Sequence, residues 1–203
     1  TFRGTPPAVV GSLCQKLSVV PWINLPVKTT IACMDSFFTA LASTYTGGAV
    51  IVCVGNEIWF PSPNVDATYV LDYVAAGLDA DGGGVPIEIK DSSGNVVAWA
   101  AATDSQKTYA GYAELLSRAW DSATRILGAS RVIKMMEGRN SIFTEAKPAF
   151  YYTDLLTGLQ IGAEVDEYAV AVYVTQRVGG SHTAILRQLQ HVDIYGVSGA
   201  GIT

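Results

Sequence analysis

The hydrophobic positions of the chain form several runs that predict β-strands. Residues 17–34 and 49–60 are apolar and rich in β-branched side chains, a composition typical of strands. Pro21 and Pro26 confine the first run to sheet edges or bends, because proline cannot donate to a strand ladder. Gly55-Asn56 divides the second run in two and suits the tight turn of a hairpin.

Further segments are also predicted to be extended. The clearest is a hairpin at 85–103, in which Ile87 and Ile89 alternate with polar residues before the turn DSSGN. Residues 130–137 and 165–178 are predicted strands on their β-branched and apolar content. Residues 182–197 predict a returning strand, although their apolar positions would equally suit a helix with Ser181 as its cap.

Three segments carry a helical pattern instead. Residues 34–48 predict a short helix with Asp35 as its N-cap and a Gly-Gly pair at its end. Residues 64–80 predict a second helix, capped by Asp66. The longest helix is expected at 105–128, ended by Gly128. Its apolar residues recur at steps of three and four: Tyr109, Tyr112, Leu116, Ala119, Ala123 and Ile126.

The order of these elements predicts the fold class. The strands come in hairpin-like pairs, and the helices stand between the pairs rather than after every strand. This order favours antiparallel sheets with helical connections, either α+β or a mainly β sandwich, over a doubly wound parallel sheet. No internal repeat or linker interrupts the 203 residues, so we expect one domain spanning 1–203.

The composition adds a surface argument. Hydrophobic residues make up 49% of the chain and charged residues only 15%, against about 25% in an average protein. A large interface with other subunits would remove the excess apolar surface from water, and the alternative is a coat of uncharged polar residues. The net charge of −5 and the lack of a basic run predict at most weak contact with nucleic acid.

The three cysteines, Cys14, Cys33 and Cys53, are odd in number and lie mostly in apolar runs. We expect them to be buried thiols rather than a disulfide framework, which favours a reducing compartment. No signal peptide or membrane span is expected from the sequence. The first residue is Thr1, which fits Met removal, precursor cleavage or a start outside this chain.

The glycine-rich loop at 78–86 is the stretch that most resembles a site. Asp79, Asp81 and Gly84 match an EF-hand calcium loop, but Gly83 has no side-chain oxygen and Lys90 replaces the bidentate acid. A phosphate loop would need a Gly-Lys-Ser/Thr ending at a helix, whereas these glycines lead into a predicted strand. We therefore expect an exposed turn that holds no metal ion.

Other candidate residues are equally weak. His182 and His191 are the only histidines, and on a helix they would face opposite ways, so they could not share a metal. The stretch GVSGAG at 196–201 lacks the second glycine of a serine nucleophile elbow. We predict no catalytic, cofactor-binding or metal residue, and both histidines are expected to be structural.

Two features could contact neighbouring subunits. On a strand, Glu164 and Asp166 would share a face and could meet a cation or an Arg, although a solvated strand entrance, with Glu167, is favoured. The aromatic residues are expected to be core or interface anchors rather than base-stacking platforms. At least one of Trp22, Trp59 and Trp120 is predicted to be buried at a subunit contact.

The paired strands at 50–60, 85–101 and 168–197, with helices between them, resemble the jelly-roll coat protein of a small icosahedral virus. The resemblance covers most of the chain by pattern, without a diagnostic motif. It implies a capsid subunit that binds copies of itself and other shell subunits, assembled in the host cytoplasm and located in the virion. Such coats often carry a basic N-terminal arm, but residues 1–16 contain only Arg3 and Lys16.

Two other function classes stay open. The chain could be a cofactor-independent enzyme, such as a hydrolase, that uses His182 or His191 with an acid. It could also be a ligand-binding module with one exposed aromatic patch. Particle size separates these classes from a coat subunit.

Overall fold

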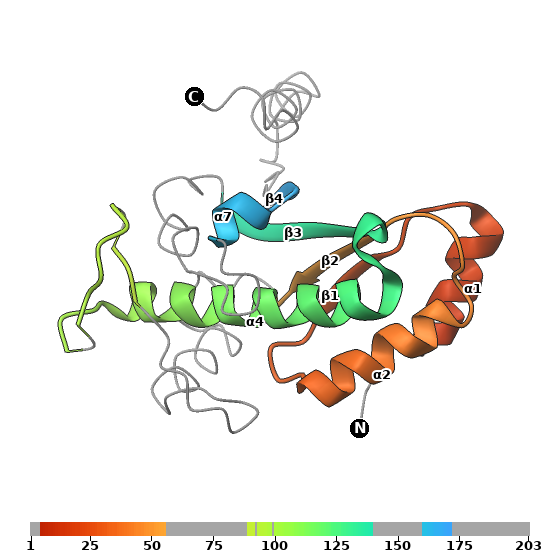
Figure 1. Cartoon of the computed structure of the whole chain (residues 1–203), viewed down its shortest axis with the longest axis horizontal. Coiled ribbons are helices and arrows are strands. Elements are labelled where there is room, and N and C mark those ends of the chain that lie inside the picture. Colours follow the sequence, from red (N-terminus) through yellow and green to blue (C-terminus); the bar gives the residue numbers. More distant parts are fainter. Residues whose placement is uncertain (1–4, 56–88, 92, 99, 140–159, 172–203) are drawn as a thin grey trace, which may run out of the picture.

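The computed structural model describes residues 5–55, 89–91, 93–98, 100–139 and 160–171. Two helices and two strands alternate in the first quarter: α1 (Pro7–Leu17), β1 (Trp22–Leu25), α2 (Ile31–Ala42) and β2 (Val50–Val54). A long helix, α4 (Asp104–Leu127), leads through the 3-10 turn η1 (Ala129–Arg131) into β3 (Val132–Arg139) (Figure 1). The short helix α7 (Ile161–Glu164) precedes β4 (Glu167–Ala171).

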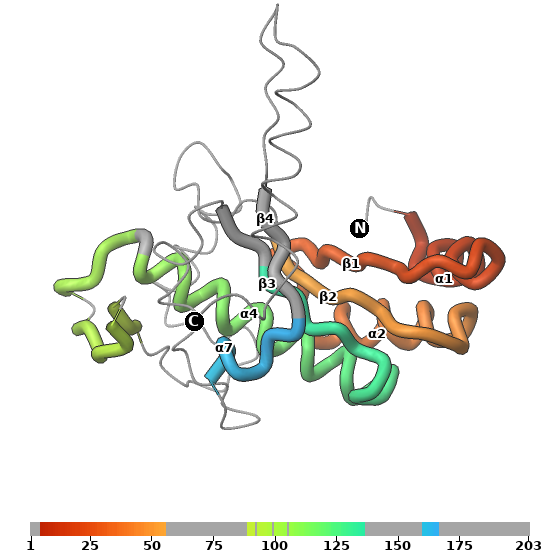
Figure 2. Tube along the Cα trace, turned by 90° about the horizontal axis from the view of Figure 1, so that it is seen from above, coloured from red at the N-terminus to blue at the C-terminus, as the bar shows by residue number. Residues whose placement is uncertain are grey.

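The described strands form one parallel sheet. β1, β2 and β3 lie side by side (Figure 2). β4 pairs with β3, giving the order β1-β2-β3-β4. The long strand β3 changes partner along its length. Val132–Lys134 pair with β2, and Met135–Arg139 pair with β4.

The expected antiparallel jelly-roll sandwich is therefore wrong. All three strand pairs are parallel, and parallel neighbours require a crossover, which α2 supplies between β1 and β2. The apolar run at 17–34, predicted as strand, contains three elements: the end of α1, β1 and the start of α2. β2 is flanked by β1 and β3 on its two sides, and the second half of the predicted hairpin, after Gly55, lies outside the described residues.

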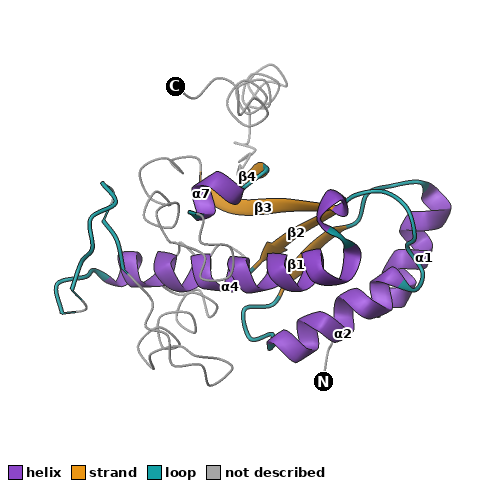
Figure 3. Cartoon of the chain, viewed as in Figure 1, coloured by secondary structure: helices purple, strands orange, loops and turns teal. Residues whose placement is uncertain are grey.

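Helices α2 and α4 cover the same face of this sheet (Figure 3). Paired residues of parallel strands point to one face, so the register places Ile23, Val52 and Lys134 together on the helix side. The buried core between the layers is formed by the inward side chains of the strands and of both helices, among them Leu25, Val50, Val54, Phe38, Leu41, Leu116, Trp120 and Met136.

Helix α1 packs on α2 at a close crossing. Gly11 is buried there, and a Cβ atom added to it would clash with Thr44 Oγ1 and lie 3.0 Å from the Leu41 carbonyl oxygen. The Thr44 hydroxyl donates a hydrogen bond of 2.8 Å to the Ala8 carbonyl oxygen of α1. No helix was expected at 7–17 from the pattern of hydrophobic positions.

Helix α4 confirms the predicted long helix almost residue for residue. Thr103 and Gln106 form a capping box at its start, and Gly128, at φ +92°, ends it. Residues 108–117 are buried on every side, which goes beyond the single apolar face in the sequence pattern. The N-terminal half of α4 projects past the carboxyl ends of β1 and β2 (Figure 1).

Several smaller predictions have mixed outcomes. Helix α2 begins earlier than expected, with Thr30 as its N-cap, so Asp35 lies within the helix. The turn of the predicted hairpin is present: Lys90 and Val96 form an antiparallel bridge, and the Asp91 carboxylate accepts hydrogen bonds from the backbone of Ser93 and Asn95. The helix predicted at 64–80 and the element at 182–197 lie outside the described residues.

Candidate functional site

Ligands of open parallel sheets bind at the carboxyl edge of the strands. The hydrogen-bonded pairing of β2 with β3 ends at Val52 and Lys134, and from Met135 onward β3 pairs with β4. We call this point the fork. At this fork the buried Trp120 of α4 donates a hydrogen bond of 3.0 Å from Nε1 to the Val52 carbonyl oxygen. The indole thereby satisfies a strand carbonyl at the point where the ladder stops.

Lys134 lies beside that indole and is held by two acidic residues. Its ammonium forms an ion pair with Glu164 Oε2 and lies 5.6 Å from the centre of the Trp120 ring. Its backbone N–H donates a 2.9 Å hydrogen bond to Asp166 Oδ2, and its carbonyl accepts one of 2.9 Å from the Asp166 backbone. Because these contacts already engage the charged groups, the cluster is suited to joining β3 to the α7–β4 segment.

This geometry corrects the prediction for Glu164 and Asp166. The two residues do not share a strand face, since Glu164 ends helix α7 and Asp166 precedes β4. Glu164 is buried and paired within its own chain, so it is not part of a solvated strand entrance. The sequence signal that was missed is the single lysine inside the apolar run of β3.

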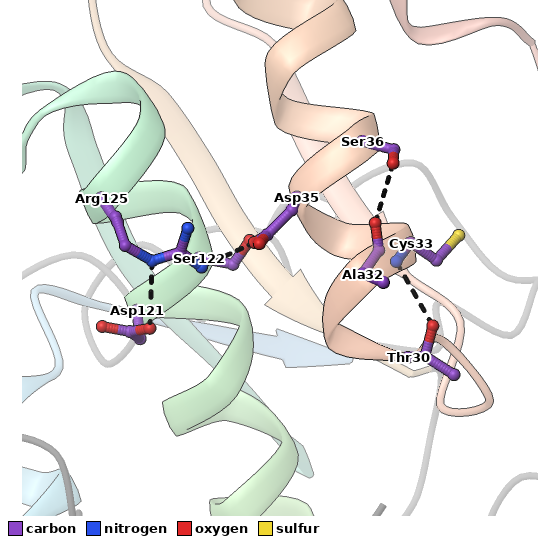
Figure 4. A network of polar contacts seen from close by, with 8 residues as sticks. All are labelled: Thr30, Ala32, Cys33, Asp35, Ser36, Asp121, Ser122 and Arg125. Carbon is purple, nitrogen blue, oxygen red and sulfur yellow. Dashed lines mark hydrogen bonds and ion pairs between the residues drawn. The ribbon is translucent and has the colours of Figure 1, made fainter. Parts of the chain in front are cut away.

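A second polar network joins α2 to α4. Asp35 Oδ1 accepts hydrogen bonds of 2.5 Å from the Ser122 hydroxyl and 2.7 Å from Arg125 Nη2 (Figure 4). Arg125 also lies 3.7 Å from Asp121 Oδ2, one turn earlier on the same helix. Ser122 is fully buried, whereas Asp35 and Arg125 are partly exposed.

The contact between Asp35 and Arg125 stabilises the charged form of both side chains. The hydrogen bond from Arg125 lowers the pKa of Asp35, and the smaller opposing effect is the partial burial of the carboxylate. The same contact raises the pKa of Arg125. Asp35 is therefore an acceptor at neutral pH and is poorly suited to act as a general acid.

The loop between β1 and α2 connects a strand to a helix, as a phosphate-binding loop does, but it lacks the sequence of such a loop. Thr29 Oγ1 donates to the Pro26 carbonyl oxygen at 2.6 Å, and the Thr30 side chain accepts from the Cys33 backbone at 3.3 Å. No glycine lies between Leu25 and Ile31, so the backbone lacks the residues that let such a loop wrap around phosphate.

The cysteine prediction is partly confirmed. None of the three cysteines forms a disulfide, and Cys14 and Cys53 are buried as expected. Cys33 is exposed on the first turn of α2, so its predicted burial is wrong. The helix turns this residue outward although its neighbours in the sequence are apolar.

A buried ion pair also lies inside α4. Glu114 Oε1 and Arg118 Nε are 2.6 Å apart, one turn from each other, in the part of the helix that is most enclosed. Neither residue belongs to the apolar series predicted for this helix. The remaining candidates, namely the loop at 78–86, His182, His191, Trp59 and the stretch at 196–201, lie outside the described residues.

The strongest surface feature is apolar. Seven large hydrophobic residues are exposed in the described part of the chain, and six of them fall between Val9 and Trp22. On α1 they form a row at steps of four, which we call the α1 ridge: Val9 (53% exposed), Leu13 (55%) and Leu17 (60%). Val19, Val20 and Trp22 continue the exposed apolar segment into β1. Trp120, in contrast, is internal to the chain.

No protein-family model, curated protein or solved structure matches this chain. Within the described ranges, His, Cys, Asp and Glu side chains nowhere gather in a group of three or more that could hold a metal ion. The helices described here also include none long and apolar enough to cross a membrane. The exposed apolar segment is thus the feature on which a functional proposal can be based.

Proposed function

We propose that this chain is a structural subunit that assembles with copies of itself into a protein shell, as the coat of a virion does. The observation that carries the proposal is the concentration of exposed apolar side chains between Val9 and Trp22. Apolar surface gathered in one place is typical of a protein-binding face, whereas isolated exposed hydrophobic residues are ordinary.

The composition supports the same function. With 15% charged residues, the chain has few ionic groups with which to keep a monomer dispersed in water. Contact between copies removes apolar surface from water and needs no basic arm. The net charge of −5 is consistent with at most weak contact with a packaged nucleic acid. The proposal includes a location in the virion after assembly in the host cytoplasm.

The parallel sheet contradicts the jelly-roll fold, and the proposed shell function does not depend on that fold. It depends on surface and composition, because fold and function are only loosely coupled. Trp22 is the tryptophan that now suits a subunit contact, since it is 54% exposed at the start of the edge strand β1. Exposed aromatic residues are among the commonest anchors of protein interfaces.

A second candidate is an enzyme, favoured by one observation. Parallel sheets covered by helices present their carboxyl ends as ligand sites in many enzymes, and this chain has such an edge at Leu25 and Val54. The polar side chains described near that edge are engaged in structural contacts, so the shell subunit has the stronger support.

The test is the size of the purified full chain in solution. Sedimentation velocity over a range of concentrations, together with negative-stain electron microscopy, should show capsomers or closed particles far larger than 21.5 kDa. A species that stays at the monomer mass at every concentration would rule out self-assembly. Hydrolysis of an ester or peptide substrate panel by that monomer would instead support the enzyme.

A further inference from the structure

We propose that α1 forms a helix pair with α1 of a second copy, about a twofold axis close to Leu13. This inference rests on the proposed self-assembly, and it assigns the first contact between two copies to α1. The residues that would meet are the α1 ridge, Val9, Leu13 and Leu17.

The two sides of α1 have different environments. One side is held against α2 through the buried Gly11 and Cys14 and the hydrogen bond from Thr44 to Ala8. The ridge projects away from that contact, with each of its three side chains more than half exposed. The helix is therefore fixed on α2, while no element of the described part of the chain buries its apolar row.

The spacing of the ridge suits a copy of itself. Side chains at steps of four form a continuous row on a helix, and two such rows interdigitate when the helix axes cross at about −50°. A twofold axis brings the same row from both copies together, so one self-complementary surface completes the contact. No heterologous groove is required.

Charge also favours a second copy over a membrane surface. Helices that lie on membranes usually carry several lysines or arginines on their polar face, whereas Lys16 is the only charged residue of α1. A single long cation at the rim of a helix pair can extend into water. An acidic partner would find almost no complementary charge on this helix.

A stable dimer needs a larger contact than three side chains of one helix provide. A monomer's largest apolar patch is typically about 300–600 Å², whereas a standard interface buries roughly 800 Å² on each partner. The ridge would thus form the centre of the contact, and Val19, Val20 and Trp22, which follow it in the chain and are also exposed, would extend it.

The first experiment compares Leu13→Glu with Val96→Glu in the full chain, by sedimentation velocity. Val96 is 65% exposed and pairs with Lys90 across the turn at 91–95, so it controls for a new surface carboxylate. We expect Leu13→Glu to raise the dimer dissociation constant at least about 30-fold, because two carboxylates would face each other near the axis. Val96→Glu should change it less than about threefold.

The second experiment does not depend on a disruptive variant. Leu13→Cys in a Cys33→Ser background should form an intermolecular disulfide rapidly under mild oxidation, because residues at a twofold axis lie close to their own copies. Val96→Cys in the same background should not. Circular dichroism would confirm that each variant keeps its helix content.

The outcomes separate this inference from the proposed function. If the wild-type chain assembles but Leu13→Glu assembles equally well and Leu13→Cys does not cross-link, the helix pair is wrong and the shell proposal stands. If the wild-type chain is a monomer, both are wrong. Binding of wild type, but not Leu13→Glu, to anionic phosphatidylserine vesicles without dimer formation would assign the ridge to a membrane and overturn the inference.

Discussion

Trp120 Nε1 donates a hydrogen bond of 3.0 Å to the carbonyl oxygen of Val52, at the end of the ladder between β2 and β3. The two residues are 68 positions apart, so this contact couples the longest helix to the centre of the sheet. It also locates the core, since Trp120 is 1% exposed and is among the largest fully buried side chains.

Replacing Trp120 by Phe should therefore be costly. The change removes the donor to a buried carbonyl and leaves a cavity, and we expect the free energy of unfolding to fall by about 2–4 kcal/mol. Urea denaturation at one fixed chain concentration measures this, because assembly adds to apparent stability. Trp22→Phe is the control: this indole is 54% exposed and its Nε1 donates to Cys53 Sγ at 3.0 Å, so we expect a smaller loss, below about 1 kcal/mol, in the unassembled chain. Equal effects of the two variants would contradict the assignment of Trp120 to the core.

The contact between Asp35 and Arg125 predicts a pH-dependent stability. The folded-state pKa of Asp35 is lowered, so its contribution is complete above the unfolded-state value of about 3.9 and is lost as the pH falls through the lower folded-state value. Asp35→Asn should cost about 1 kcal/mol at pH 7, since both side chains are partly in water. The difference from wild type should shrink in acid.

Asp121→Asn is the matched control for that experiment. Asp121 lies farther from Arg125, at 3.7 Å, and is more exposed, so its removal should cost less than about 0.5 kcal/mol. Unfolding curves from about pH 7 to about pH 3 would distinguish the two acids. A constant difference between wild type and Asp35→Asn across this range would show that the ion pair has no role.

The crossing of α1 and α2 predicts strong sensitivity to one methyl group. Gly11→Ala places a Cβ atom against Thr44 Oγ1 and the Leu41 carbonyl, and we expect a loss of about 1–3 kcal/mol in unfolding free energy. Gly47→Ala has no atom within 4 Å of the new Cβ and should be neutral or slightly stabilising. Thermal melts of the two variants give the comparison, and similar melting temperatures would show that the helices can separate freely.

The ion pair of Lys134 and Glu164 should be tested by a double-mutant cycle. Lys134→Met leaves the buried Glu164 carboxylate without this ammonium, and we expect a loss of at least about 2 kcal/mol. The double variant Lys134→Met/Glu164→Leu should be more stable than Lys134→Met alone, because no charge then remains buried at this position. Additive effects of the two changes would argue against a direct interaction.

Local sequence was sufficient to predict the elements whose signals are local. The periodicity of α4, its end at Gly128 and the turn at Asp91 depend on residues within a few positions of one another, so the order of amino acids alone reveals them. A further signal of this kind was overlooked. The uninterrupted apolar run of β2 is typical of a parallel strand covered on both faces, whereas an antiparallel strand with one wet face alternates.

Tertiary structure alone decided the pairing of distant residues. Asp35 could be assigned as a cap from its neighbours, but its contacts are Ser122 and Arg125, 87 and 90 positions away. The partner change of β3, the insertion of Trp120 at the fork and the exposure of the α1 ridge are likewise set by how the layers pack. Backbone propensity acts over one or two turns, so the sequence alone determines single helices and turns. Burial depends on every segment that packs into the same space, so only the tertiary structure decides which distant residues pair and which side chains stay exposed.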